Sequence, residues 1–215
     1  MNDVREARRL PSPAPRPLGL AFDGERLWMG SLETCRVYSI DPLHWTATDE
    51  AQAPGYPFGM QTLGDELRVV IGMGDEDDRY VYRFVPGHGF KESSRFACPD
   101  LTGSHLAFDG DTLFLSQAAN KRIFALDGAG TPVRTIGLPC RLVGMTIVDG
   151  NFYVVAADEE VENLHLTQVD ARGETPVVTE LAKIPFAARG LTWDGSLFWT
   201  SHRDQHEIVA FEKPA

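Results

Sequence analysis

One six- or seven-residue phrase recurs five times along the chain, and this self-similarity constrains the fold more than any other feature of the sequence. The phrase reads Gly-Leu-Ala-Phe-Asp-Gly at residues 19–24, and its copies start at residues 59, 105, 144 and 190. Successive copies are therefore separated by 39 to 46 residues. A period of this length is typical of β-propellers, in which each repeat forms one blade of four strands.

Each repeat has the pattern of short antiparallel strands. In the first repeat an apolar run at residues 19–22 is followed by an Asp-Gly pair and two further runs, at 27–31 and 36–41. β-branched and aromatic residues fill such runs, and no long segment has the helical period of 3.6 residues. Asp-Gly between two apolar runs predicts hairpins with type I′ turns. The sequence therefore predicts an all-β fold, a five-bladed β-propeller with four-stranded blades.

The fifth repeat ends after its third strand, so its blade lacks an outer strand. The segment 4–10 precedes the first repeat and has no other partner, and we expect it to pair with the last blade and close the ring, because an open sheet edge invites aggregation. The chain is then one domain with no residues left for a second. The predicted blades are residues 13–53, 54–98, 99–138, 139–184, and 185–215 together with 4–10.

The charge balance narrows the possible partners. Twenty Lys and Arg against 31 Asp and Glu give a formal net charge of −11. Nucleic acid and anionic membranes attract basic surfaces, so neither is an expected partner. The N-terminus lacks the apolar stretch of a signal peptide, and no run is long enough to cross a membrane. With Cys35, Cys98 and Cys140 expected to be free thiols, these features predict a cytoplasmic protein.

The repeated phrase resembles the blades of the NHL, streptogramin-lyase and glutaminyl-cyclotransferase group of propellers. The residues that carry the resemblance are 19–24 with Leu27-Trp28, and 190–195 with Phe198-Trp199. Five blades are most similar to the cyclotransferase branch, which places a glutamate before the Gly-Leu of an inner strand. The corresponding positions of this chain hold no glutamate; they are Leu18, Phe58, Ser104, Val143 and Arg189. The resemblance thus implies the fold, while the catalytic acid of that branch has no counterpart here.

The same resemblance implies that the starts of the inner strands and the loops between second and third strands face one mouth of the central channel. Four inner strands start with glycine, and the third has a histidine instead; the five residues are Gly19, Gly59, His105, Gly144 and Gly190. Glycine would let the strands converge on the axis, whereas His105 would project an imidazole into the channel. The alternative is that His105 fills space and is hydrogen-bonded to neighbouring backbone.

A second histidine departs from the repeat in the loops of the same mouth. His202 occupies the position held by Ser31 and Gln117 in other repeats. Because histidine titrates near neutrality, we expect His105 and His202 to act as acid, base or ligand, with Asp204 beside them. These three are the predicted catalytic residues. The predicted ligand-binding residues are Ser31, Glu33, Tyr56, Gln117, Arg189 and Arg203.

The sequence specifies no cofactor, and it leaves open whether the site binds a divalent metal ion. His202 and His206 have a spacing that binds zinc on a helix, but here it falls in a loop between strands. Asp75 with Asp77, or residues 158–160, could hold Ca²⁺, although neither run has the spacing of a known calcium loop. The alternative for both runs is a solvated acidic loop.

The sequence predicts a small-molecule enzyme of lyase, cyclotransferase or hydrolase type, with its site at the channel mouth and a small-molecule ligand in the channel. A non-catalytic propeller that binds a small ligand or a protein on the same face is the main alternative. A purely structural role in a larger assembly is the third. Oligomeric state is not specified by the sequence.

Overall fold

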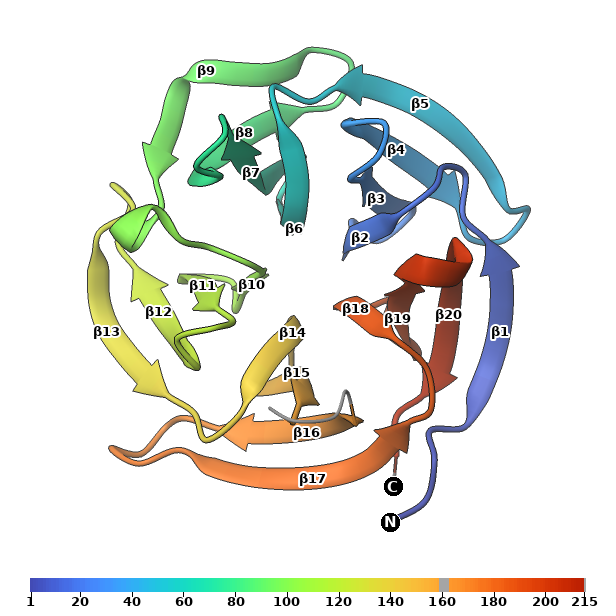
Figure 1. Ribbon diagram of the computed structural model, residues 1–215, viewed down its shortest axis with the longest axis vertical. Coiled ribbons are helices and arrows are strands. Elements are labelled where there is room, and N and C mark those ends of the chain that lie inside the picture. The colour runs from blue at the N-terminus through green and yellow to red at the C-terminus, as the bar shows by residue number, and fades with distance from the viewer. Residues whose placement is uncertain (159–162, 215) are drawn as a thin grey trace.

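The structure, a computed structural model, describes residues 1–158 and 163–214 and contains five four-stranded antiparallel sheets arranged around a central axis (Figure 1). The innermost strands are β2 (Pro17–Phe22), β6 (Tyr56–Leu63), β10 (Leu106–Phe108), β14 (Arg141–Val148) and β18 (Ala188–Trp193). The second strands are β3 (Leu27–Ser31), β7 (Glu66–Met73), β11 (Leu113–Gln117), β15 (Asn151–Ala157) and β19 (Leu197–His202). The predicted five-bladed all-β propeller is confirmed.

The outer half of each blade completes the sheets. The third strands are β4 (Arg36–Asp41), β8 (Asp78–Val85), β12 (Arg122–Leu126), β16 (Leu164–Asp170) and β20 (Glu207–Glu212). The outermost strands are β5 (Thr46–Gln52), β9 (Gly89–Ala97), β13 (Pro132–Gly137), β17 (Val177–Ile184) and β1 (Glu6–Pro11). Two short 3₁₀ turns, η1 (Pro99–Leu101) and η2 (Arg203–Gln205), lie in connections. No helix in this described part of the chain has the length and apolarity that crossing a membrane would require.

The ring closes through the N-terminal strand, as predicted. β1 pairs antiparallel with β20, with Glu6 opposite Phe211 and Pro11 opposite Glu207. The strand starts two residues later than expected, because Val4 pairs with the neighbouring blade instead. The Val4 N–H donates to the carbonyl of Lys183 in β17 (2.8 Å). The N-terminal segment therefore joins blade four to blade five.

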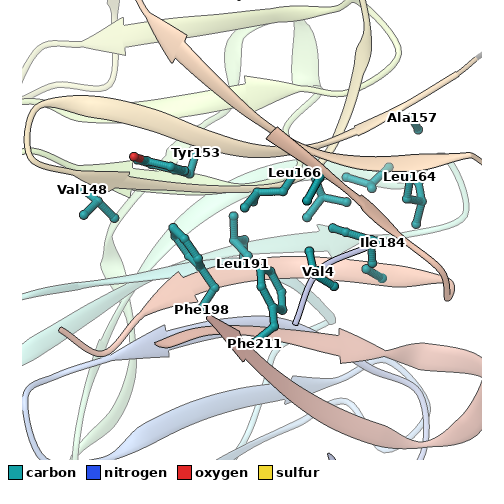
Figure 2. Packing of buried hydrophobic residues seen from close by; sticks show 14 residues of the cluster. Val4, Val148, Tyr153, Ala157, Leu164, Leu166, Ile184, Leu191, Phe198 and Phe211 are labelled. Atoms are coloured by element: carbon teal, nitrogen blue, oxygen red, sulfur yellow. The ribbon is translucent and has the colours of Figure 1, made fainter. Parts of the chain in front are cut away.

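Five apolar clusters, one at each junction between neighbouring blades, form the core. Figure 2 shows the cluster between blades four and five, where Val4 and Ile184 lie close to Leu191 and Phe211. The indole of Trp199 stacks on that of Trp45 between blades five and one, with ring centroids 5.9 Å apart. Each blade buries both faces of its sheet in this way, which explains why several strands are apolar throughout rather than alternating.

The hairpins between first and second strands lie at the end of the channel that we call the turn end. Of these five hairpins, all of which lie in the described part of the chain, only that at Asp149-Gly150 has positive φ at both central residues (51° and 74°), as a type I′ turn requires. In the turns at Gly24, Gly110 and Gly195 the glycine alone has positive φ, so the predicted type I′ is wrong there. The reason is that the preceding aspartate lies outside the two-residue loop and caps it. Its carboxylate accepts the backbone N–H groups two and three residues ahead, as Asp23 does for Glu25 and Arg26.

Candidate functional site

The opposite end of the channel, where the inner strands begin, is the mouth, and four glycines bring the strands together there. A Cβ built on Gly59 would clash with the Cα of His105, and one on Gly190 would clash with the carbonyl oxygen of Leu18. The same holds for Gly19 against Phe58, and for Gly144, whose Cβ would lie 2.7 Å from the backbone of Gly190. These positions need glycine because the backbone of one blade lies against the backbone of the next.

His105 is the exception in this column of glycines, and a built segment presents it. β10 is the shortest inner strand and begins only after His105, whose backbone N–H donates to Ser116 Oγ (3.0 Å). In the preceding segment Asp100 and Leu101 both have positive φ (54° and 52°). Non-glycine residues in this conformation are strained and cluster at functional sites. The segment 98–105 therefore departs from the repeat in backbone as well as in sequence.

Side chains from two blades hold this segment in place. Gln117 donates from Nε2 to the carbonyls of Pro99 (2.7 Å) and Thr102 (2.8 Å), while its Oε1 accepts from the Arg122 guanidinium (2.6 Å). From blade two, Arg79 Nη1 donates to the carbonyl of Gly103 (2.9 Å). The Gln117 amide, predicted to bind ligand, is thus engaged by the protein itself, and its role in this structure is to anchor the segment that carries His105.

The imidazole of His105 is buried, with 6% of the residue exposed. Among the residues that the structure describes, neither ring nitrogen has a hydrogen-bond partner, so the alternative of a ring bonded to nearby backbone is not seen. Burial, followed by the charges of Arg189 and Arg79, lowers the pKa of His105 to about 4. At neutral pH the ring is therefore uncharged, with one nitrogen able to accept a proton and the other carrying one.

Arg189 is a second polar group at the mouth. It precedes Gly190 in β18, is 9% exposed, and donates from Nη1 to the carbonyl of Ala188 (2.8 Å). The pairing of β18 with β19 shifts between Arg189 and Thr192, and β2, β6 and β14 have comparable shifts next to their mouth glycines. Such bulges redirect side chains and are frequent beside functional sites.

Arg79 and Phe58 belong to the mouth, although the sequence reasoning did not select them. The Arg79 guanidinium lies 3.3 Å from the centroid of the Phe58 ring and forms an ion pair with Asp77. Arg79 comes from β8, 26 residues before His105 in the sequence. The sequence indicates a place at the mouth only for Phe58, which directly precedes Gly59 just as Arg189 directly precedes Gly190.

His202 contacts a different set of residues from those around His105. Its Nδ1 accepts a hydrogen bond from Arg9 Nη1 (3.2 Å), Glu207 Oε2 is 3.4 Å away, and its ring lies 5.3 Å from that of Phe186. Arg9 belongs to β1, the outermost strand of blade five. No interaction between the rings of His202 and His105 occurs within residues 1–158 and 163–214, so their convergence on one ligand stays a prediction.

The remaining predicted residues differ in accessibility. Ser31 is fully buried and donates to the carbonyl of Pro15 (2.6 Å). Asp204 is 62% exposed, and its carboxylate lies 3.4 Å from Arg203 Nε. Tyr56 is half exposed and Glu33 is exposed. The structure thus gathers His105 and Arg189 at the mouth and gives Ser31 a structural bond.

The described residues contain no group of three or more His, Cys, Asp or Glu side chains placed to hold a metal ion. His206 Nδ1 accepts the backbone N–H of Arg16 (3.0 Å), whereas His202 Nδ1 is bonded to Arg9. The two histidines therefore have different partners. Asp77 is paired with Arg79, while Glu159 and Glu160 lie outside the described residues. The divalent metal ion therefore stays a prediction.

Cavity size alone does not point to the mouth. A cavity of about 500 Å³ lies at the turn end between blades one and two, and one of about 490 Å³ lies against β17 and the Asp3 segment. Neither is lined by His105 or Arg189. Both cavities are therefore separate from the mouth, where the buried imidazole of His105 lies.

No protein-family model matches the sequence, and comparison with curated proteins likewise gave no match. Similar solved structures include the PQQ-bound aldose sugar dehydrogenase from Streptomyces coelicolor, with a TM-score of 0.64 and 12% identity over 99% of this chain and 82% of that one. The glutaminyl cyclase from Myxococcus xanthus has a TM-score of 0.56 and 14% identity over 75% and 72%. Virginiamycin B lyase from Staphylococcus aureus has a TM-score of 0.51 and 11% identity over 96% and 98%. At these identities the likeness shows the propeller fold alone.

Proposed function

We propose that the protein acts on a small molecule at the mouth of its channel, as an enzyme of lyase, cyclotransferase or hydrolase type, with His105 as the proton acceptor. One observation carries the proposal. At the single position where the column of mouth glycines is interrupted, a strained and well-anchored segment presents a neutral imidazole whose ring nitrogens have no hydrogen bond within the described residues.

The three reaction types share the step that His105 would perform. In elimination, a base removes a proton from carbon and the released electron pair forms the double bond as the leaving group departs. In cyclisation or hydrolysis, the base removes the proton of the attacking amine or water. His202 and Asp204 have partners elsewhere, so His105 bears the proposal without them.

A non-catalytic binding site at the same mouth is the second candidate. It is favoured by one observation, the pKa of about 4 at His105, since a base this weak removes protons less readily than one with a pKa near 7. We also propose a cytoplasmic location, which rests on the sequence features alone.

Activity of His105→Asn against three substrates tests the two candidates. The substrates are virginiamycin B, a peptide with N-terminal glutamine, and a small carboxylic ester, chosen to represent elimination, cyclisation and hydrolysis. His88→Asn is the matched control, because His88 is an exposed histidine in an outer turn. We expect turnover of one substrate to fall about 100-fold or more in His105→Asn and to stay unchanged in the control. Equal rates in both variants, with their unfolding midpoints intact, would favour the binding candidate.

A further inference from the structure

Blade three departs from the repeat at the turn end as well as at the mouth. In blades one and five, the aspartate that caps the first hairpin also accepts the indole N–H of a tryptophan five residues later. The pairs are Asp23 with Trp28 and Asp194 with Trp199, each at 2.6 Å. In blade three the capping residue is Asp109, and Phe114 holds the tryptophan position. Phe114 pairs with Ala107 across the hairpin, and Trp28 pairs with the equivalent alanine, so the two rings occupy equivalent places.

A phenyl ring has no N–H, so one carboxylate oxygen of Asp109 lacks the partner that the other blades supply. Asp109 Oδ1 accepts the backbone N–H groups of Asp111 (2.9 Å) and Thr112 (2.7 Å). Within the described residues, Asp109 Oδ2 has no hydrogen bond. Blade three therefore keeps the acceptor of the aspartate–indole pair without the donor.

Asp109 and Phe114 also line a cavity of about 140 Å³ between blades three and four. Most of the remaining lining is apolar, and it includes Ile136, Ile147, Phe152 and Ala171. The rings of Phe114 and Phe152 meet edge to face, with centroids 4.9 Å apart. An apolar cavity of about 150 Å³ can bind benzene, so this volume suits one small ring. The groove at the equivalent place between blades one and two is wider, about 500 Å³, but there Trp28 already occupies the capping aspartate.

The charged groups around the cavity favour neither an anion nor a cation. Those that line it in the described structure are Asp109, Arg134 and Arg172. Arg134 is fixed across the junction by bonds to two carbonyls of blade four, and Arg172 forms an ion pair with Asp170. The carboxylates of the adjacent hairpin residues, Asp111 and Asp149, are exposed, so water and salt screen their charge. Charges of both signs thus surround the cavity, which suits a neutral molecule.

We infer that this cavity binds a small, neutral heteroaromatic molecule whose ring N–H donates to Asp109 Oδ2, in the place of the missing indole. The ring of the ligand packs against Phe114 and Phe152. A hydrogen bond to a carboxylate is stronger than one between neutral groups, so the N–H is what the site recognises. The cavity lies at the turn end, and the inference is therefore independent of the function proposed for the mouth.

Binding of two isosteric probes, measured by isothermal titration calorimetry, tests the inference. Indole carries the N–H, whereas benzofuran has an oxygen at the same position and cannot donate. We expect the native protein to bind one indole per chain, about tenfold more tightly than benzofuran, because benzofuran leaves the carboxylate oxygen without a donor. A third probe, N-acetyltryptophanamide, presents the same ring as a protein would. Tighter binding of this probe than of indole would overturn the inference in favour of a tryptophan side chain from a partner protein.

Two cavity variants and one control locate the binding. Phe114→Trp restores the residue found in blades one and five, so its own indole should fill the cavity and weaken indole binding about tenfold or more. Asp109→Asn keeps an oxygen for the hairpin cap and replaces Oδ2 by an NH₂ group, so it should abolish the preference for indole over benzofuran. Asp111→Asn makes the same change of charge at an exposed residue of the same hairpin and should change neither affinity.

The native protein and Asp109→Asn decide the outcome even if Phe114→Trp does not fold. Absence of indole binding, or equal affinities of the native protein for indole and benzofuran, would overturn the inference. So would an unchanged preference for indole in Asp109→Asn, because the ring N–H would then have another acceptor.

Discussion

The turn end and the mouth are built from the same five repeats, yet aspartate caps recur in three hairpins at the turn end, whereas the residues just before the inner-strand starts at the mouth differ in all five blades. At the turn end, Asp23, Asp109 and Asp194 each accept two backbone N–H groups, and two of them also accept an indole N–H, from Trp28 and Trp199. At the mouth, the positions before the four glycines and His105 hold five different residues: Leu18, Phe58, Ser104, Val143 and Arg189.

The difference separates stability from function. A residue type that recurs in several blades stabilises each of them, either by closing its hairpin or by allowing close packing against the next blade. A residue that departs from the repeat in one blade, as His105 does, is not needed for blade stability and therefore indicates a function of the whole ring. Loops and strand ends on a rigid scaffold are where proteins usually place such single groups.

The largest expected effect comes from Gly59→Ala at the mouth. The added methyl group would overlap backbone atoms of Ser104 and His105, which no side-chain rotation can relieve. We expect the free energy of unfolding to fall by about 3 kcal/mol or more, measured by denaturant unfolding. Gly137→Ala is the control, since a Cβ there meets nothing within 4 Å and φ is not positive. Similar losses for both variants would mean that the glycine column is not a backbone contact.

A smaller loss is expected at the turn end from Asp194→Ala. The carboxylate accepts bonds from the N–H groups of Ser196 and Leu197 and from the Trp199 indole, which is buried. Leaving these donors unpaired should lower the free energy of unfolding by about 2–3 kcal/mol while ligand binding at the mouth is unchanged. Asp65→Ala is the matched control, because Asp65 is an exposed aspartate in the hairpin of blade two, its φ is not positive, and its carboxylate has no hydrogen bond within the described residues. Lost mouth binding in Asp194→Ala would show that the two ends are coupled.

The two ends should also differ in how acid affects them. The native pKa of His105, about 4, lies below the unfolded value of about 6.5. Between these values the unfolded chain takes up a proton that native His105 does not, so stability falls as pH drops through this window, by at most about 1.4 kcal/mol per pH unit. Burial raises the pKa of Asp194, but bonds from Trp199 and the backbone outweigh it, and the net shift is downward. Its contribution is therefore present above the unfolded value, near pH 4, and is lost only below it.

Unfolding of the two variants between pH 7 and pH 3 separates these windows. In His105→Asn the slope between pH 6.5 and 4 should become smaller, while Asp194→Ala should keep that slope and lose the steeper fall below pH 4. An unchanged slope in His105→Asn would mean that the ring is not held neutral by its surroundings.

The smallest effect concerns reactivity without any change in stability. Cys98 begins the segment that carries His105, is 2% exposed, and has its pKa raised to about 12 by burial, against the opposing charge of Arg79. We expect a thiol reagent at pH 8 to leave Cys98 unmodified in the native protein and to find three free thiols after denaturation without reductant, counted by mass spectrometry. Rapid labelling of native Cys98 would show that the mouth segment opens locally.

Most of the fold could be predicted because it depends on a pattern that occurs five times. The blade number followed from the repeated phrase, and the closing strand followed from the third strand that ends the last repeat. Turn type could not be predicted from Asp-Gly alone, since it depends on whether the aspartate lies inside the loop, as Asp149 does, or caps it, as Asp23 does.

The site was less accessible to sequence reasoning. His105 could be singled out because it interrupts a column of glycines, and Arg189 because it precedes one of them. Arg79 could not, since it reaches the mouth from a third strand of another blade through its bond to Gly103. The environment of His202 depends on Arg9, which only the closed ring brings near.

The pairing of β1 with β20 also determines when, during synthesis of the chain, the ring can close. The 195 residues that lie between Pro11 and Glu207 in the sequence must be made before β1 can meet its partner β20. At about 5–20 residues per second, β1 waits on the order of ten seconds or more without its sheet. Blades one to four can form during that interval, because each consists of consecutive strands. Glu6, Arg8 and Arg9 give the unpaired β1 charged side chains, which discourage pairing with another newly made chain.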